Sequence, residues 1–125
     1  MAVESPSQPR QLQPVEANRP VISVQHLTKK FGGEVAVQDV SFDVPRASIF
    51  GFIGPSGSGK TTTVRLLTGV YAPTQGAVTV LDRSPAQFSQ ADRARLGYMP
   101  QLFVLYPNLT VWENLNFAAS LYGMS

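Results

Sequence analysis

Cysteine is missing from this sequence of 125 residues, and histidine occurs only once. Without cysteine the chain forms no disulfides, no thiol nucleophile and no cysteine zinc site, which fits a reducing compartment. No apolar run approaches the roughly 20 residues that cross a bilayer, and the N-terminal residues lack the apolar core of a signal peptide. We therefore expect any contact with a membrane to be made through a partner.

Charged side chains are also scarce. Ten Lys and Arg and eight Asp and Glu leave a formal net charge of +2, and they are scattered without basic runs. This pattern does not favour a nucleic-acid partner. Hydrophobic residues make up 43% of the chain, which is enough to bury a core in one domain.

Residues 1–20 differ in composition from the rest. They hold four of the ten prolines and few large apolar side chains. Such a segment cannot bury enough apolar surface to offset the entropy that is lost on ordering. We predict a disordered, proline-rich tail over residues 1–20 and a folded region over residues 21–125.

Within the folded region, β-branched residues, alternation and turn residues predict strands. The predicted strands are residues 21–27, 36–44, 48–54, 77–81 and 96–100, with a Gly32-Gly33 turn between the first two. Because the run at 48–54 is almost wholly apolar, it is expected to be covered on both faces in a parallel sheet.

Capping residues and helical spacing predict three helices. One follows residue 60 and stops at Gly69, and a short one spans residues 84–95 with Ser84 as its N-cap. The third starts at a capping box of Thr110 and Glu113 and ends at Gly123, with one apolar face.

The most informative stretch lies between the apolar run and the first helix. It matches the phosphate-loop (Walker A) pattern G-x-x-x-x-G-K-[ST] at every position, in the strand-to-helix context that the pattern requires. Its residues are Gly54, Pro55, Ser56, Gly57, Ser58, Gly59, Lys60 and Thr61, followed by Thr62. The competing interpretation is a glycine-rich turn with a surface lysine.

Phosphate chemistry explains this composition. Successive backbone N–H groups and a helix N-terminus hold a polyphosphate well, and side chains would block that approach, hence the glycines. Lys60 would reach the β and γ phosphates, Thr61 would supply a hydroxyl to Mg²⁺, and Thr62 would lie near the α phosphate. We predict a nucleoside triphosphate and Mg²⁺ as ligands. The loop alone does not name the reaction.

Two flanking stretches narrow the choice. "LTKKFGG" places Phe31 at a strand end 29 residues before Lys60, and "GYMPQ" places Gln101 at a strand end 41 residues after it. With these motifs in this order, the stretch from about 21 to 123 resembles the ATP-binding subunits of ABC transporters, most closely exporters of the ABC-2 or multidrug type. The resemblance implies an α/β P-loop NTPase core with an antiparallel β subdomain and the start of a helical subdomain.

The resemblance also implies roles for the two flanking residues. Phe31 would stack on adenine; the alternative is a hydrophobic plug at a strand end. Gln101 would reach Mg²⁺, as a metal ligand together with Thr61, or the attacking water, as the catalytic residue. It would also link the site to the membrane-spanning partner. Its alternative is an exposed polar residue after a proline.

Other polar and aromatic residues are not expected to bind a ligand. Lys29 and Lys30 are expected on a solvated strand edge, and His26 and Trp112 in packing. Asp82 imitates the acidic end of an apolar strand, but Arg83 follows it and it lies only 22 residues after Lys60. A Mg²⁺ role for Asp82 is therefore disfavoured.

The implied activity is ATP binding and, in the complete protein, ATP hydrolysis that powers transport across a membrane. Partners would be transmembrane subunits or domains and a second ATP-binding domain, on the cytoplasmic face of the membrane. The family's serine-glycine-glycine signature, Asp-Glu strand end and switch histidine are not in this sequence. We therefore expect a truncated, N-terminal part of a longer protein, marginally stable alone, that binds nucleotide without turning it over.

Two rival functions remain. One is a non-transport ABC ATPase that acts on ribosomes or DNA, against which the segment after Gln101 and the lack of basic clusters argue. The other is a small-molecule kinase, in which the phosphate loop usually opens the first βα unit. Here a stretch of β-rich sequence precedes that unit, which disfavours a kinase.

Overall fold

The computed structural model describes residues 19–102 and 104–124. The chain divides into two compact units, one up to Phe88 and one from Ser89 onward, and each is described by itself. Most of the predicted tail, residues 1–18, lies outside the described residues. No helix within the described ranges is long and apolar enough to cross a membrane.

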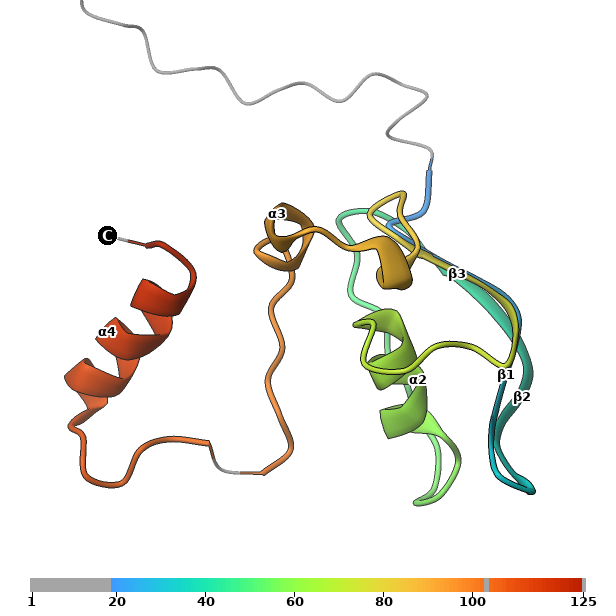
Figure 1. Ribbon diagram of the computed structural model, residues 1–125, viewed down its shortest axis with the longest axis horizontal. Coiled ribbons are helices and arrows are strands. Elements are labelled where there is room, and N and C mark those ends of the chain that lie inside the picture. The colour runs from blue at the N-terminus through green and yellow to red at the C-terminus, as the bar shows by residue number, and fades with distance from the viewer. Residues whose placement is uncertain (1–18, 103, 125) are drawn as a thin grey trace, which may run out of the picture. The chain divides into compact units, whose positions relative to one another are not determined.

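The first unit is built on a three-stranded antiparallel sheet with strand order β2-β1-β3 (Figure 1). Its strands are β1 (Ile22–Phe31), β2 (Glu34–Val44) and β3 (Gln75–Val80). Ile22 pairs with Val44 on one side and with Val80 on the other. The predicted strands near residues 21–27, 36–44 and 77–81 and the Gly32-Gly33 turn are confirmed.

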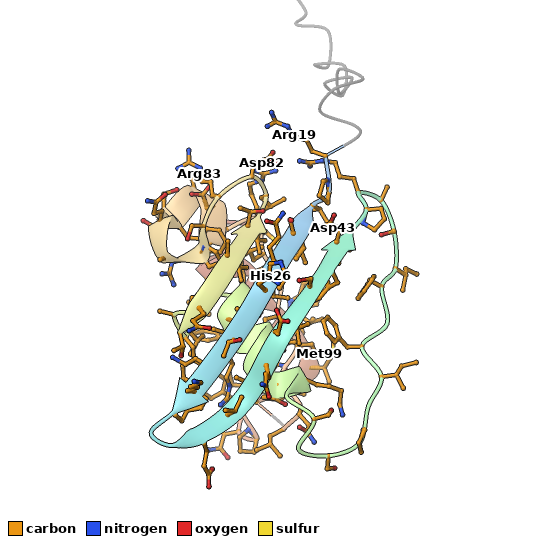
Figure 2. The ribbon with its side chains drawn as sticks, turned by 90° about the vertical axis from the view of Figure 1, so that its right-hand side faces the viewer. Arg19, His26, Asp43, Asp82, Arg83 and Met99 are labelled. Carbon is orange, nitrogen blue, oxygen red and sulfur yellow. The ribbon has the colours of Figure 1, made fainter. Side chains whose placement is uncertain are left out.

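One face of this sheet forms the core with helix α2 (Lys60–Leu67). The buried apolar side chains are Val24, Leu27, Val37, Val44, Leu66, Leu67, Val78 and Val80. Val64 is half-buried, and Gly69 follows the helix with a left-handed backbone at φ +81°. Figure 2 views the opposite face of the sheet, where His26 and Asp43 lie and where α2 is behind the strands.

The prediction of a buried parallel strand at 48–54 is wrong for this chain. The segment forms no ladder with any described strand, and Ile49 and Ile53 are 103% and 98% exposed. It is held by aromatic contacts instead, because Phe50 and Phe52 lie 5.5 and 5.0 Å from the ring of Phe42 on β2. An apolar run becomes a buried strand only where neighbouring strands take up its backbone hydrogen bonds, and here none does.

The second unit holds α3 (Gln90–Arg93) and α4 (Val111–Leu121). The predicted strand at 96–100 is wrong, since no described strand pairs with it. The predicted helix at 84–95 is also wrong as a single element. It divides into the 3₁₀ turn η1 (Pro85–Gln87) and α3, because Ser84 makes no capping bond whereas Ser89 forms a capping box with Asp92.

Helix α4 has the ends that the sequence predicts. The Thr110 side chain accepts from the Glu113 amide, the Glu113 carboxylate accepts from the Thr110 amide, and Gly123 adopts φ +67° after the last turn. None of the residues of α4 is buried, however. Trp112 is 70% exposed, so its predicted packing role is not found within this unit.

Candidate functional site

The phosphate loop lies between the aromatic cluster of Phe42, Phe50 and Phe52 and the first turn of α2. Ser58 donates its amide to the Pro55 carbonyl at 3.2 Å, which closes a tight turn inside the loop. Gly57 and Gly59 adopt φ of +81° and +91°, a left-handed conformation that glycine tolerates and other residues rarely adopt. Two of the predicted glycines are therefore required by backbone geometry.

Gly59 also joins the loop to the sheet. A Cβ atom at this position would lie 2.6 Å from the Ala36 carbonyl oxygen and 3.1 Å from a methyl carbon of Val37 on β2. Only a residue without a side chain permits this approach. The close packing of loop on strand fixes where α2 begins, because Gly59 is the N-cap of that helix.

The N-terminus of α2 has the features of an anion site. No side chain caps it, and no acidic residue lies in its first turn. The first helical backbone bond runs from the Thr63 amide to the Gly59 carbonyl at 2.9 Å, so the amides of Lys60, Thr61 and Thr62 precede it. These N–H groups and the positive end of the helix dipole are available to phosphate oxygens.

Lys60 points back into the loop. Its ammonium donates to the carbonyls of Gly54 and Pro55, the latter at 2.8 Å, and to the Ser58 hydroxyl at 3.2 Å. The side chain thus places a positive charge inside the loop, where carbonyl oxygens hold it. A phosphate group that enters the loop would exchange these weak acceptors for charged ones.

Thr61 and Thr62 occupy the first turn of α2, with Thr61 exposed and Thr62 half-buried. The hydroxyl of Thr63, by contrast, donates to the Gly59 carbonyl at 2.8 Å and is buried. The threonine that supports the helix is therefore a different one from the two predicted ligand threonines. Pro55 and Ser56 lie on the exposed part of the loop.

Phe31 ends β1 beside Lys29 and beside Tyr71, a residue for which no prediction was made from the sequence. Its ring lies 5.1 Å from that of Tyr71 at an interplanar angle of 73°, and the Lys29 ammonium lies 5.0 Å from its centroid. Lys29 also donates to the Ala72 carbonyl at 2.8 Å, so the expectation of a merely solvated Lys29 is wrong. The pair was missed because Phe31 and Tyr71 lie 40 residues apart and no local pattern links them.

Gln101 belongs to the second unit and is exposed. The phosphate loop belongs to the first unit, and the predicted role of Gln101 stays a prediction. The segment that follows it is organised by Asn114 of α4. That side chain accepts from the Tyr106 amide at 2.9 Å and donates to the carbonyls of Tyr106, Leu109 and Thr110.

Two residues that were not expected to bind a ligand, Asp82 and His26, form side-chain pairs outside the phosphate loop. The Asp82 carboxylate accepts from Arg46 at 3.0 Å, which accounts for it without a metal. His26 lies in an exposed pair with Asp39, with 2.8 Å between its Nδ1 and the carboxylate, so its packing role is limited to the surface. Within the described ranges, no group of three or more His, Asp or Glu side chains could hold a metal ion.

Comparison with known proteins gives matches over most of the chain. The family model described as "ABC transporter" matches residues 37–124. The probable multidrug ABC transporter ATP-binding protein YbhF of Escherichia coli is 46% identical over 104 residues. The Nod factor export ATP-binding protein I of Bradyrhizobium diazoefficiens is 42% identical over 104 residues. The spermidine/putrescine import ATP-binding protein PotA of Rubrobacter xylanophilus is 39% identical over 110 residues.

These relatives are much longer than the match. The aligned stretch covers 83 to 87% of this chain but 18% of YbhF, 34% of the Nod factor protein and 29% of PotA. A solved ATP-binding subunit of an ABC transporter superposes with a TM-score of 0.72 at 32% identity, over 84% of this chain and 44% of that one. A dimeric ATP-binding cassette with bound ADP and phosphate superposes with a TM-score of 0.66 at 26% identity, over 81% and 47%.

Proposed function

The chain belongs to the ABC transporter family, and from this premise we propose that its residues 54–62 bind the triphosphate of MgATP. The observation that carries the proposal is the loop itself. An uncapped helix start, two left-handed glycines and an inward-pointing lysine together provide N–H donors and one positive charge. Such preorganised donors suit a polyphosphate and few other ligands.

Each residue of the loop then has a task. The backbone amides of Gly57 to Thr62 hold the phosphate oxygens, and Lys60 moves from the loop carbonyls to the β and γ phosphates. Phe31 receives the adenine ring; 43% of its surface is exposed and open to a base.

The oxygen donors present fit Mg²⁺, a hard cation that prefers oxygen ligands. The Thr61 hydroxyl would bind it on the loop side, and the Gln101 side-chain oxygen is the proposed second ligand. When bound with the nucleotide, Mg²⁺ would neutralise part of the phosphate charge. Gln101 is also proposed to orient the attacking water during hydrolysis.

For the whole protein, we propose ATP hydrolysis that drives transport of a substrate across a membrane. Export is favoured by the amino-acid sequence of the phosphate loop and by the similarity to a multidrug protein and an export protein. The chain is also similar to PotA, which is an import protein. The proposed partners are membrane-spanning subunits and a second ATP-binding domain, in line with the dimeric cassette. The proposed location is the cytoplasmic face of the membrane.

A non-transport ABC ATPase remains the second candidate. It shares the nucleotide site and differs in its partner, which would be a ribosome or DNA. The near-neutral charge, +2 without basic runs, supports the transport function over this alternative.

The proposal is tested by titrating the purified chain with MgATP and comparing two lysine variants. Lys60→Ala removes the charge inside the loop and is expected to weaken binding by about 10-fold or more, since a hydrogen bond to a charged group contributes about 1.5–3 kcal/mol. Lys30→Ala, an exposed lysine outside the loop, is the matched control and should bind like wild type. Equal affinity of all three chains, or no saturable binding by wild type, contradicts the proposal.

Turnover is a separate question. The family elements that complete hydrolysis are not in this sequence, so the 125-residue chain is expected to bind MgATP without hydrolysing it. Phosphate release measured over many turnovers should equal that of buffer. Release that persists in wild type and disappears in Lys60→Ala would contradict this expectation.

A further inference from the structure

A cluster of two aromatic rings and two cations surrounds the proposed base-stacking residue. Phe31 contacts Tyr71 edge to face at 5.1 Å, and Lys29 lies 5.0 Å from the Phe31 centroid and 5.8 Å from that of Tyr71. Arg65 of α2 lies 5.8 Å from the Tyr71 ring and donates to the Tyr71 hydroxyl at 3.1 Å. Tyr71 is therefore held on one side by α2 and contacts Phe31 on the other.

The backbone supports the same arrangement. The Val70 and Tyr71 amides both donate to the Arg65 carbonyl, at 2.9 and 3.3 Å, so the chain after α2 is folded back on the helix. Lys29 joins β1 to this segment through the Ala72 carbonyl. Tyr71 is thus attached to α2, the helix that begins at the phosphate loop, whereas Phe31 is attached to β1.

Edge-to-face packing constrains a ring more than burial alone does, because the positive edge of one ring seeks the negative face of the other. Phe31 is 43% exposed, and the contacts of its ring are with the Tyr71 ring and the Lys29 ammonium, of which only Tyr71 makes an aromatic contact. A base-stacking ring must be held in one orientation to present its face, since an unordered ring loses entropy when the base binds.

We propose that Tyr71 is a positioning residue for Phe31: it fixes the Phe31 ring relative to α2, so that the base and the phosphates of one nucleotide are engaged together. The inference rests on the proposed nucleotide function and adds a residue to it. Tyr71 is not proposed as a ligand of the phosphates. The competing interpretation is that the cluster only seals the end of the sheet.

The two interpretations differ in which ligands lose affinity when Tyr71 is replaced. A positioning role affects only ligands that carry a base, whereas general loosening of the unit affects the phosphate loop as well. The experiment therefore compares the affinities of the full chain for MgATP and for inorganic tripolyphosphate with Mg²⁺. The variants are Tyr71→Ala, Tyr71→Phe, Phe31→Ala, the double variant Phe31→Ala with Tyr71→Ala, and Tyr98→Ala as an exposed tyrosine control from the second unit.

Tyr71→Ala is expected to weaken MgATP by about 3- to 10-fold, the size of one aromatic pair, and to leave tripolyphosphate unchanged. Tyr71→Phe keeps the ring and should retain most of the affinity. The double variant should bind no more weakly than Phe31→Ala alone, because Tyr71 acts through Phe31. Tyr98→Ala should resemble wild type.

Three results would overturn the inference: unchanged MgATP affinity in Tyr71→Ala, equal losses for MgATP and tripolyphosphate, or additive losses in the double variant. If Tyr71→Ala does not fold, Tyr71→Leu retains bulk without an aromatic face and the same comparison decides. Failure of the proposed function looks different, since wild type itself would then bind neither MgATP nor tripolyphosphate.

Discussion

Gly59 carries two constraints at one position, and they can be separated by substitution. Its φ of +91° is strained for any residue with a side chain, and a Cβ would also lie 2.6 Å from the Ala36 carbonyl oxygen. Gly57 has the first constraint alone, with φ +81° and open space, and Gly33 has neither. A side chain would therefore violate no constraint at Gly33, one at Gly57 and two at Gly59.

We expect Gly33→Ala to change the free energy of unfolding by less than about 0.5 kcal/mol, and Gly57→Ala to lower it by about 1–2 kcal/mol through the left-handed backbone. Gly59→Ala should cost more than Gly57→Ala, because the loop must also move away from β2. Urea unfolding followed by circular dichroism measures the order. A Gly59→Ala chain as stable as Gly57→Ala would show that the loop does not pack on the strand.

At the scale of residues, the sequence predicted features that lie within one short stretch and missed contacts between residues far apart in the chain. The phosphate loop is a contiguous pattern, and two of its three glycines, Gly57 and Gly59, have a left-handed backbone in the structure. Tyr71 and Arg65 have no such pattern, since their contact with the Phe31 neighbourhood forms only when β1 and the segment after α2 come together.

Among the elements, α4 depends on its capping residues and on Asn114, because it buries none of its own residues. The Asn114 side chain makes four hydrogen bonds to the backbone of the preceding loop. We expect Asn114→Ala to release that loop and to speed amide exchange at Tyr106 by about 5-fold or more, the effect of about 1 kcal/mol per hydrogen bond. Asn116→Ala, on the same helix, is the control.

Hydrogen exchange followed by NMR or mass spectrometry reads the Tyr106 amide directly. Unchanged exchange in Asn114→Ala would mean that the loop is held by other contacts. A change of the same size in Asn116→Ala would attribute the effect to the helix and not to the Asn114 side chain.

The ends of α4 were predictable and the apolar run was not, for one physical reason. The hydrogen bonds of a capping box such as that of Thr110 and Glu113 join residues three positions apart, so both partners can be read from one short stretch of sequence. A buried parallel strand is satisfied by other strands, and residues 48–54 pair with none in the described part of the chain. The antiparallel hairpin of β1 and β2 was found because its turn, Gly32-Gly33, is local.

For the molecule as a whole, exposed apolar surface limits stability. Large hydrophobic side chains are more than half exposed at many positions, among them Ile49, Ile53, Met99, Leu102, Val111, Trp112 and Leu121. Exposed large apolar side chains in this number favour association or aggregation. We expect the purified chain to unfold at low temperature without a sharp transition, to bind a hydrophobic dye when native, and to show solvent-exposed emission from Trp112.

Differential scanning calorimetry and fluorescence test this expectation. A cooperative transition at high temperature would contradict it. So would a blue-shifted Trp112 emission that moves to longer wavelength on unfolding, because it would require that the α4 surface be covered.

The central claim is that a backbone cradle at residues 54–62 holds the phosphates of a nucleotide. The most direct measurement is the NMR shift of individual amides in ¹⁵N-labelled chain titrated with MgATP and, separately, with tripolyphosphate. We expect saturable shifts of the Gly57, Gly59, Lys60 and Thr61 amides with both ligands, and shifts near Phe31 with MgATP only. Saturable binding that leaves these loop amides unmoved, or no saturable shift at all in a folded sample, would contradict the account.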